Sequence, residues 1–222
     1  MQLSIKTSGK AGSHPMGESA PIVYVVDDDI SVREALEALI RESGWQPWVF
    51  ASAQEFLSHP RTSTPSCLVL DVSLPDLNGL ELQQQLAASR NDMPIIFITG
   101  YGDVPMTVRA MKAGAIEFLT KPFGDEALLN TIRDAIQRSA TALGQEAELQ
   151  RLQRRHASLS MREREVMSLV VTGLMNKQVG GKLGISEITV KAHRGQVMRK
   201  MGAKSLADLV NMAAKLGITR QN

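Results

Sequence analysis

Short apolar runs alternate with amphipathic segments over residues 21–138, and this alternation constrains the fold more than any other feature of the chain. Each run is continuously apolar instead of alternating between apolar and polar residues, as expected for strands of a sheet that is covered on both faces. Repeated strand–helix units of this kind predict an α/β fold with a doubly wound sheet of five parallel strands. The predicted strands are Ile22–Val26, Trp48–Phe50, Cys67–Leu70, Ile95–Ile98 and Ile116–Leu119.

Helix-capping patterns mark where the intervening helices begin. Ser31 with Glu34, and Ser52 with Glu55, have the spacing of a capping box, in which the two side chains satisfy free backbone N–H groups at a helix start. Two such patterns between strands support the strand–helix alternation. Further helices are expected at Leu80–Ala88, at Val104–Ala113 and from Asp125 onward.

The last of these helical patterns does not stop cleanly. From about Ala127 to Leu152, apolar residues recur at near-helical spacing through Gln- and Arg-rich sequence. The pattern predicts a long or broken helix that serves as a linker. It either carries a dimer seam or is a solvated tether, and the sequence leaves both alternatives open.

Residues 159–222 carry the signals of several short helices. Ser160 with Glu163, and Ser205 with Asp208, have capping spacing, and Gly184–Ser186 supplies a turn followed by a cap. A short segment at Asn176–Leu183 precedes this turn, and a helix at Glu187–Met201 follows it. Two helices joined by a tight glycine turn predict a small all-α domain with a helix-turn-helix.

The formal net charge of +2 conceals a strong asymmetry. Residues 1–138 carry 11 basic and 17 acidic side chains, whereas residues 139–222 carry 14 basic and 6 acidic side chains. All aromatic residues lie between Tyr24 and Phe123, so the two parts build different cores. An acidic module joined to a basic one predicts that the second part meets a polyanion.

Other features set the class of protein and its organisation. No apolar run approaches the roughly 18 residues of a membrane span, and the first twenty residues lack the apolar core of a signal peptide. The single cysteine, Cys67, excludes an internal disulfide and a cysteine-based zinc site. We therefore expect a cytoplasmic protein with no membrane partner. Its predicted parts are a disordered tail at 1–20, an α/β domain at 21–138, a helical linker at 139–158 and a helix-turn-helix domain at 159–222.

Acidic side chains follow two of the predicted strands. Asp27 and Asp28 come directly after the first strand, and Asp71 comes after the third. Ligands of doubly wound sheets bind beyond the carboxyl ends of the strands, so these carboxylates converge if the two strands are neighbours. Carboxylates a few ångströms apart require a cation or a proton between them, and Mg²⁺ prefers such oxygen ligands. The sequence therefore predicts a Mg²⁺ site.

Two further polar residues close the remaining strands of this edge. Thr99 ends the fourth strand with a hydroxyl, and Lys121, followed by Pro122, ends the fifth with an ammonium. Phosphoryl transfer onto an aspartate needs a carboxylate that attacks in line, and it needs a divalent cation, a lysine and a hydroxyl to offset charge on the phosphoryl oxygens. The four strand ends together favour this chemistry, although each residue alone is a weak signal.

These residues lie in motifs that resemble the receiver domain of bacterial two-component response regulators. The resemblance covers roughly residues 21–140 and implies a flavodoxin-like sheet of strand order 2-1-3-4-5. The motifs that carry it are Val25–Asp29, Leu68–Gly79, Ile98–Gly100 and Phe118–Phe123.

The resemblance also implies a role for each residue of the site. Asp71 is expected to be the phosphoacceptor. Asp28, Asp71 and the backbone carbonyl of Ser73 are expected to hold Mg²⁺, with Asp27 assisting through water. Thr99 and Lys121 are expected to engage the phosphoryl group. Phe118 occupies the aromatic switch position, and the bond into Pro122 is expected to be cis.

The helix predicted at Glu187–Met201 has one face suited to DNA. At 100° per residue, Val190, Val197 and Met201 share the core face, and Ile188, Ala192, Gly195 and Arg199 lie opposite, with Lys191 on the flank. A face of small residues lets a helix enter the major groove deeply and contact thymine methyl groups. Lys191 is the best candidate for a base contact. Lys177, Arg199 and Lys200 are candidates for phosphate contacts.

A second resemblance covers this domain. Leu159–Val166, Gly173–Lys177, Leu183–Ser186 and Thr189–Arg194 are similar to the LuxR-type helix-turn-helix, in the arrangement of the FixJ branch of response regulators. It implies DNA contacts at Lys191, Ala192 and Gly195. It also implies dimerisation through the last helix, although ordinary core packing explains that helix equally well. The residues concerned are Leu206, Leu209 and Val210.

Two glycines depart from the usual pattern of the family. Gly180 stands where alanine is usual, which raises a question about the stability of its helix, because a helical glycine costs about 1 kcal/mol relative to alanine. Gly195 stands where a longer side chain is common, which raises a question about how many bases the second helix reads.

We therefore expect a two-domain transcription regulator that is not an enzyme. A sensor histidine kinase phosphorylates Asp71 with Mg²⁺, and the protein then forms a homodimer on promoter DNA, with RNA polymerase as a further candidate partner. One alternative is a phosphatase with an aspartyl-phosphate intermediate, which needs a second acid such as one two residues after the nucleophile, where this chain has Ser73. Another is a receiver with an RNA-binding or protein-binding output.

Overall fold

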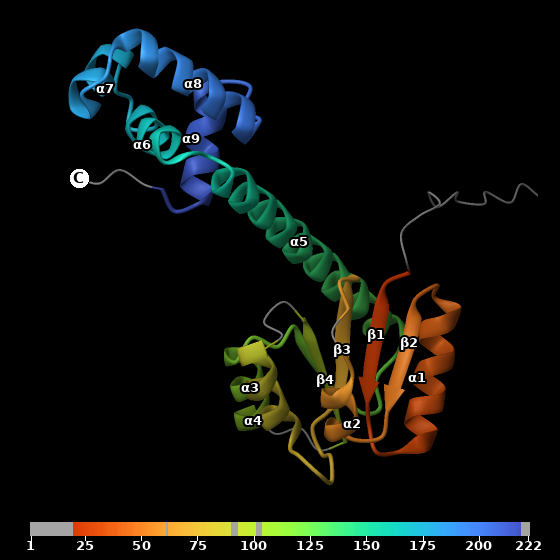
Figure 1. Ribbon diagram of the computed structural model, residues 1–222. Coiled ribbons are helices and arrows are strands. Elements are labelled where there is room, and N and C mark those ends of the chain that lie inside the picture. The colour runs from red at the N-terminus through yellow and green to blue at the C-terminus, as the bar shows by residue number, and fades with distance from the viewer. Residues whose placement is uncertain (1–19, 61, 90–92, 101–103, 219–222) are drawn as a thin grey trace, which may run out of the picture. The chain divides into compact units, whose positions relative to one another are not determined.

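The computed structural model describes residues 20–60, 62–89, 93–100 and 104–218 (Figure 1). The chain divides into two compact units, Met1–Ala140 and Thr141–Asn222. Within the described ranges, no helix combines the length and the apolar character that crossing a membrane requires. The tail predicted at residues 1–20 lies outside the described residues, apart from Ala20.

The first unit contains a parallel five-stranded sheet of order β2-β1-β3-β4-β5, which confirms the predicted fold class and strand order. Observed and predicted strands differ by at most two residues at either end. The strand register places Val26 beside Leu70 and Asp71 beside Ile98, so the carboxyl ends of β1, β3 and β4 meet at one edge of the sheet. The strands are β1 Ile22–Val26, β2 Gln46–Phe50, β3 Ser66–Asp71, β4 Ile95–Thr99 and β5 Glu117–Thr120.

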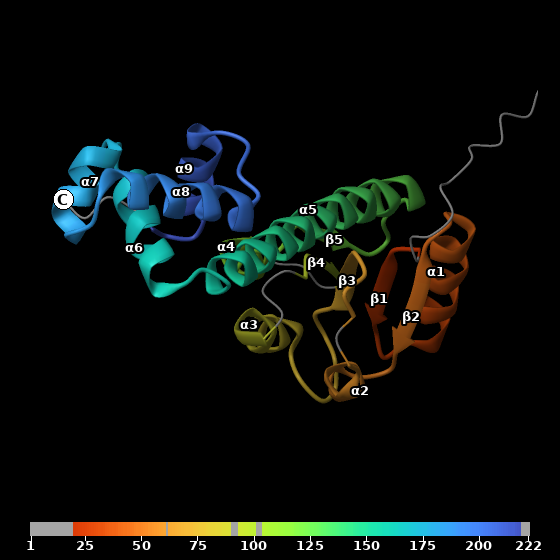
Figure 2. The same ribbon diagram turned by 45° about the horizontal axis from the view of Figure 1, so that its top comes forward.

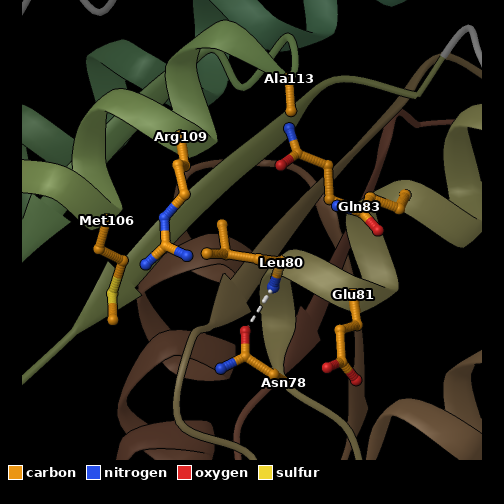
Figure 3. Close-up of a pocket in the computed structure, with 8 residues that line it drawn as sticks. Asn78, Leu80, Glu81, Gln83, Met106, Arg109 and Ala113 are labelled. Carbon is orange, nitrogen blue, oxygen red and sulfur yellow. Dashed lines mark hydrogen bonds between the residues drawn. The ribbon is translucent and has the colours of Figure 1, made fainter.

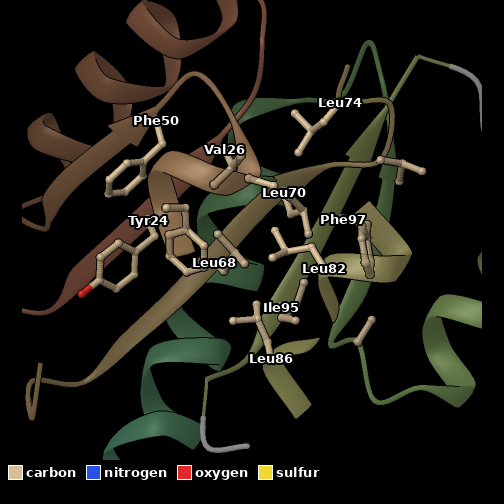
Figure 4. Close-up of a cluster of buried hydrophobic side chains, with 14 of the residues drawn as sticks. Tyr24, Val26, Phe50, Leu68, Leu70, Leu74, Leu82, Leu86, Ile95 and Phe97 are labelled. Carbon is tan, nitrogen blue, oxygen red and sulfur yellow. The ribbon is translucent and has the colours of Figure 1, made fainter. Parts of the chain in front are cut away.

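Helices cover both faces of this sheet, as the continuously apolar strands predict (Figure 2). On one face, Leu36 of α1 and Ile132 of α5 pack against β1, β3 and β4. On the other face, α2, α3 and α4 bury Phe56, Leu82 and Ala110, and Figure 4 shows part of this cluster. The helices are α1 Ile30–Glu42, α2 Ala53–Ser58, α3 Gly79–Ser89, α4 Val104–Lys112 and α5 Asp125–Ala157.

The start of α1 corrects one expectation from the sequence. The helix begins at Ile30, and its N-cap is Asp29, whose side chain accepts a hydrogen bond from the Ser31 backbone N–H at 2.8 Å. The predicted capping box of Ser31 and Glu34 is therefore wrong. The other caps agree with prediction, since Ser52, Ser160, Ser186 and Ser205 each accept the expected backbone hydrogen bond.

The fifth helix is continuous over its 33 residues, which selects the long helix over the broken one. Its Ser139 side chain is buried and accepts a hydrogen bond from the backbone N–H of Ser66 at 3.0 Å, which ties α5 to the start of β3. The peptide bond between Lys121 and Pro122, just before α5, is cis, as the family resemblance implied.

The second unit is all-α, and its core is aliphatic. Val166, Val190, Val197 and Leu209 are buried together, and the Leu152 side chain of α5 is also buried. A Cβ atom on Gly180 would lie 2.7 Å from the carbonyl oxygen of Ile185, so this close approach explains a glycine where the family usually has alanine. The helices are α6 Met161–Val170, α7 Asn176–Leu183, α8 Glu187–Met201 and α9 Leu206–Lys215.

Candidate functional site

Adjacent strands bring three aspartates together at the carboxyl edge of the sheet. Because β1 and β3 are neighbours, Asp27 and Asp71 lie side by side at this edge. One carboxylate oxygen from each of Asp27, Asp28 and Asp71 lies within 4.8 Å of the others. Asp27 is fully buried, Asp71 is 6% exposed and Asp28 is exposed to solvent. We call these three residues the acidic cluster.

Lys121 provides a positive charge to the acidic cluster. Its ammonium donates hydrogen bonds to Asp27 Oδ2 at 2.7 Å and to Asp71 Oδ2 at 2.6 Å. The lysine follows β5, whereas Asp27 follows β1 and Asp71 ends β3, so the assembled sheet brings the charges together. The ion pairs offset the repulsion of two buried carboxylates.

Backbone groups orient the same two carboxylates from the other side. Asp27 Oδ1 accepts a hydrogen bond from the Asp29 N–H at 2.9 Å, and Asp71 Oδ1 accepts one from the Ser73 N–H at 2.8 Å. Each carboxylate therefore has one oxygen on Lys121 and the other on the chain that follows its strand. Protein hydrogen bonds therefore orient both oxygens of each carboxylate.

Burial and charge shift the pKa values of this pair in ways that can be separated. Burial raises the pKa of Asp27 above its ordinary value, and this effect outweighs the opposing hydrogen bond from Lys121. Burial alone would lower the pKa of the Lys121 ammonium, but its hydrogen bonds to Asp27 and Asp71 reverse the direction and raise it. The lysine is thus held in its charged form. Its positive charge offsets part of the energetic cost of burying the ionised Asp27 carboxylate.

The other two predicted residues of the receiver lie on the neighbouring strands. Thr99 is fully buried at the end of β4, and its carbonyl accepts a hydrogen bond from the Lys121 backbone N–H at 2.7 Å. Phe118 lies one strand further on and is half-buried, with its ring centroid 6.1 Å from that of Phe97. Thr99 and Lys121 are therefore linked through their backbones.

Two residues of this region were not identified as functional from the sequence. A Cβ atom on Gly79 would lie 2.7 Å from the carbonyl oxygen of Asp71, so only glycine allows the loop after β3 to fold back against the strand end. In the same loop, Asp76 Oδ2 accepts a hydrogen bond from the Gln54 N–H at 3.0 Å at the start of α2. Both residues hold the chain that follows Asp71, and no local pattern reveals the partner of Asp76.

A separate cavity of about 360 Å³ lies between α3 and α4 (Figure 3). Gln83 reaches across from α3, and its side-chain amide donates to the carbonyl of Ala110 in α4 at 3.2 Å. Arg109 and Glu81 line the same cavity. None of its lining residues belongs to the acidic cluster, so the cavity is not part of that site.

The second unit presents the predicted helix-turn-helix. Gly184, with a φ of +67°, ends α7, and Ser186 caps α8 by accepting a hydrogen bond from the Thr189 N–H. On α8, Val190, Val197 and Met201 are buried, which confirms the core face derived from helical periodicity. The predicted outward residues are all exposed to solvent: Ile188, Lys191, Ala192, Gly195 and Arg199.

Two basic side chains of α8 bind other parts of this unit. Lys200 donates from Nζ to the Glu163 carboxylate at 2.6 Å, and the same carboxylate accepts the Ser160 N–H in the capping box of α6. Arg194 donates to Asn176 Oδ1 at 3.2 Å and so joins α8 to α7. Lys177, a further predicted contact, is exposed on α7. The structure therefore gives Lys200 an internal partner that the sequence did not reveal.

The three residues of α9 considered for dimerisation differ in burial. Leu209 is fully buried in the core of the unit, which favours the packing alternative for this residue. Leu206 is 37% exposed and Val210 is 38% exposed. The open alternative of a dimer surface therefore applies to the latter two.

Family comparisons match both units of the chain. The family described as "Response regulator receiver domain" matches residues 23–133, and the family described as "Bacterial regulatory proteins, luxR family" matches residues 157–213. The first match includes the acidic cluster, Thr99, Phe118 and Lys121. The second includes α6, α7 and α8.

Several known proteins match this chain over most of its length. The chain is 50% identical over 208 residues to nodulation protein W of Bradyrhizobium diazoefficiens, a match that covers 94% of this chain and 92% of that protein. It is 42% identical to the response regulator protein TodT of Pseudomonas putida, over 93% of this chain and 91% of that protein. It is 41% identical to the transcriptional regulatory protein FixJ of Bradyrhizobium diazoefficiens, over 88% of this chain and 96% of that protein.

Solved structures of response regulators also match this chain. The response regulator StyR is 49% identical with a TM-score of 0.81, and the match covers 89% of this chain and all of that one. Full-length FixJ from B. japonicum is 40% identical with a TM-score of 0.54, over 92% of this chain and all of that one. The chain therefore belongs to the two-component response regulators, with a receiver domain followed by a LuxR-type DNA-binding domain.

Proposed function

We propose that Asp71 accepts a phosphoryl group from a sensor histidine kinase and that this switches the DNA-binding domain. The single observation that carries the proposal is the acidic cluster with the Lys121 ammonium on two of its carboxylates. Both Asp71 oxygens accept hydrogen bonds, Oδ1 from the Ser73 backbone N–H and Oδ2 from the Lys121 ammonium, and Oδ2 is the candidate nucleophile because a side-chain ammonium can move away from it. In that reaction Lys121 leaves Asp71 Oδ2 to offset charge on the incoming phosphoryl oxygens.

The donor set of the acidic cluster suits Mg²⁺. Three carboxylates whose oxygens lie within 4.8 Å of one another match the oxygen ligands that this cation prefers. Asp28, Asp71 and the Ser73 carbonyl would hold the ion, with Asp27 assisting through water. When bound, Mg²⁺ supplies charge neutralisation for phosphoryl transfer. The chain itself orients Asp71, excludes solvent from Asp27 and holds Lys121 protonated.

Thr99 and Phe118 form the proposed switch. Phosphorylation adds about −1.5 to −2 of charge, which draws the Thr99 hydroxyl and Lys121 toward the phosphoryl group. The space that Thr99 leaves admits the half-buried ring of Phe118. A local change of charge is thereby converted into a new packing of β4 and β5, which is a two-state change.

The DNA contacts are proposed on the exposed face of α8 and the start of α7. Lys191, Ala192 and Gly195 would face base edges, and Lys177 and Arg199 would contact phosphates. The Lys200 ammonium already donates to the Glu163 carboxylate, which neutralises its charge in part. We rank it below the other candidates for this reason.

The remaining parts of the proposal concern organisation. The receiver domain would span residues 21–138, the linker 139–158 and the DNA-binding domain 159–222. The phosphorylated protein would act as a cytoplasmic homodimer on promoter DNA and contact RNA polymerase there, and its phosphoryl chemistry would be limited to its own Asp71.

Phosphoryl labelling tests the assignment of Asp71. Full-length protein is incubated with Mg²⁺ and labelled acetyl phosphate, and Asp71→Asn is compared with Asp134→Asn, which alters an exposed aspartate of α5. We expect labelling of wild type and D134N, no labelling of D71N, and loss of label on chelation of Mg²⁺ before the donor is added. Labelling of D71N at the wild-type level would show that the assignment is wrong, and steady turnover of a phosphomonoester would favour a phosphatase instead.

A further inference from the structure

Ile188 is the most exposed large apolar side chain in the part of the chain that the structure describes, with 83% of its surface accessible. It is the second residue of α8 and lies on the side of that helix opposite the buried Val190 and Val197. The buried core of this unit does not include it. Packing within the fold therefore does not explain an isoleucine at this position.

The neighbours of Ile188 on the same face are small. Ala192 and Gly195 lie one and two turns further along α8, and both are exposed. A Cβ atom on Gly195 would meet no atom within 4 Å, so the fold does not require glycine there, although glycine weakens a helix. The absence of bulk at these positions lets the helix axis approach a surface closely, with Ile188 as the one large apolar side chain that reaches it.

The charges around this face select the kind of surface. Lys177, Lys182 and Lys191 are exposed, and the structure of residues 141–218 gives none of their ammonium groups a partner. Glu187 is the one acidic residue of α8, against four Lys and Arg residues. Such a face fits a polyanion. A groove on another protein is a poorer match, because one isolated apolar side chain provides too little apolar contact for a protein interface.

The major groove of DNA presents apolar groups between two rows of phosphates. The C5-methyl group of thymine is the apolar feature that distinguishes bases there, and aliphatic side chains contact it. We propose that Ile188 determines sequence specificity by packing against the C5-methyl group of a thymine in each half-site. This inference rests on the proposed DNA-binding function and adds a residue and a base to it.

Replacing thymine by deoxyuridine tests the contact, because uracil lacks only the C5-methyl group. Duplexes bound by the full-length, acetyl-phosphate-treated protein are selected from random DNA, and each thymine of the enriched site is then replaced in turn. In each half-site we expect one thymine to be sensitive. Replacing that thymine alone should weaken wild-type binding about fourfold, the effect of one methyl group removed from an apolar contact. With Ile188→Ala the thymine and uracil duplexes should bind equally, and Ile188→Val should keep part of the difference.

The control variant is Met161→Ala, which removes another exposed apolar side chain of this unit, 76% accessible, at the start of α6. It should keep the full fourfold difference. The dependence of affinity on salt should be the same in wild type and I188A, since no charge changes. Circular dichroism confirms that I188A is folded, as expected for an exposed position.

Two outcomes would overturn this inference while leaving the proposed DNA-binding function intact. In the first, the protein binds an enriched site in a salt-dependent way, but no thymine of that site is sensitive to loss of its methyl group. In the second, a thymine is sensitive and this sensitivity persists in I188A. Failure of the phosphorylated protein to retain any duplex would overturn the proposed DNA-binding function, and the inference with it. The two failures are therefore distinguishable in one set of measurements.

Discussion

At the scale of single residues, the site depends on a glycine as much as on its charged groups. The Cα of Gly79 is so close to the end of β3 that a methyl group would lie 2.7 Å from the Asp71 carbonyl oxygen and 3.0 Å from the Val72 Cα. Both are backbone atoms, which cannot rotate away as a flexible side chain would. The position of Asp71 is therefore coupled to the absence of a side chain eight residues later.

Gly79→Ala should lower the stability of the receiver and its phosphoryl labelling together. We expect a loss of about 1–3 kcal/mol, since overpacking forces backbone shifts. Urea unfolding and acetyl-phosphate labelling of the same preparation measure both effects. The control is Gly144→Ala in the middle of α5, where a Cβ atom has open space, and it should raise stability by up to about 1 kcal/mol. Wild-type stability of G79A would contradict the packing argument.

At the residue level, the sequence was informative where strand ends determine position and did not reveal partners that are distant in sequence. The convergence of Asp27, Asp28 and Asp71 was predictable, because parallel strands of a doubly wound sheet end at one edge. The partner of Lys200, which is Glu163, lies 37 residues away on a helix whose packing against α8 the sequence does not specify. An expected phosphate contact therefore proved to be part of an internal ion pair.

At the scale of elements, the start of α1 shows how capping residues compete. Asp29 and Ser31 are both good caps and stand two residues apart, and the sequence pattern favoured Ser31 because Glu34 follows at capping-box spacing. The structure has Asp29 in the extended N-cap conformation, since the chain leaves β1 at Val26 and turns at once into the helix. The position of the preceding strand decided which cap is used, and capping rules alone do not include it.

Alanine substitutions at the two positions distinguish the two caps. Asp29→Ala should destabilise the first unit by about 1 kcal/mol, the usual effect of losing a cap, whereas Ser31→Ala should have almost no effect. Urea unfolding followed by tryptophan fluorescence is suitable, because both Trp45 and Trp48 lie in this unit. The reverse order of the two effects would restore the original capping box.

The capping box of α6 makes stability depend on pH in the second unit. The hydrogen bond from Lys200, and then that from the Ser160 backbone N–H, hold the pKa of Glu163 below its ordinary value of 4.5. A carboxyl whose pKa is lower in the folded state stabilises the fold above its unfolded pKa and loses that contribution as pH falls through the folded pKa. The contribution should therefore be complete at pH 7 and decline below about pH 5.

Glu163→Gln should remove this pH dependence. At pH 7 we expect a loss of about 1–3 kcal/mol, because Lys200 loses a charged partner, and wild type and E163Q should converge as pH falls through the lowered folded pKa of Glu163. Unfolding must be followed by far-UV circular dichroism, since no aromatic residue lies beyond Phe123. Glu165→Gln, which breaks the exposed pair with Arg162, should change stability by only a few tenths of a kcal/mol. An equal effect of both variants would show that burial of Glu163 is unimportant.

The elements themselves were largely predictable, and the long helix shows where prediction stopped. The strands and the helices α7 and α8 follow from continuous apolar runs, capping residues and a glycine turn, all of which are local signals. The sequence left open whether α5 breaks, because its apolar residues recur only at near-helical spacing through Gln- and Arg-rich sequence. The buried Ser139 and Leu152 lie in different units on one continuous helix, and such tertiary support is not visible in a local pattern.

At the scale of the whole molecule, the near-neutral net charge is the sum of an acidic receiver and a basic DNA-binding part. The basic excess is not uniformly available, since some of it is used inside the unit. Lys200 pairs with Glu163, and Lys215 pairs with Glu148. The exposed Lys177, Lys191 and Arg199 of α7 and α8 are among the charges that remain for a polyanion.

The salt dependence of DNA binding should separate these two groups of charges. The logarithm of the association constant falls linearly with the logarithm of salt concentration, with a slope of about −0.9 for each phosphate neutralised. Lys177→Ala should reduce the magnitude of the slope by about 1 for each bound protomer, whereas Lys200→Ala should leave it unchanged because its charge is already paired. Fluorescence anisotropy at several salt concentrations measures the slopes. A reduced slope in K200A would return that lysine to the set of phosphate contacts.

The acidic cluster and Lys121 together also have a defined net charge. The three carboxylates, counted as ionised, and the Lys121 ammonium sum to a charge of −2, which one divalent cation would balance. One K⁺ would leave a negative charge beside Asp27 and Asp71, which are buried, whereas Asp28 is exposed to solvent. A divalent cation should therefore bind this cluster more tightly than K⁺, because an unbalanced charge is costly where burial limits its screening.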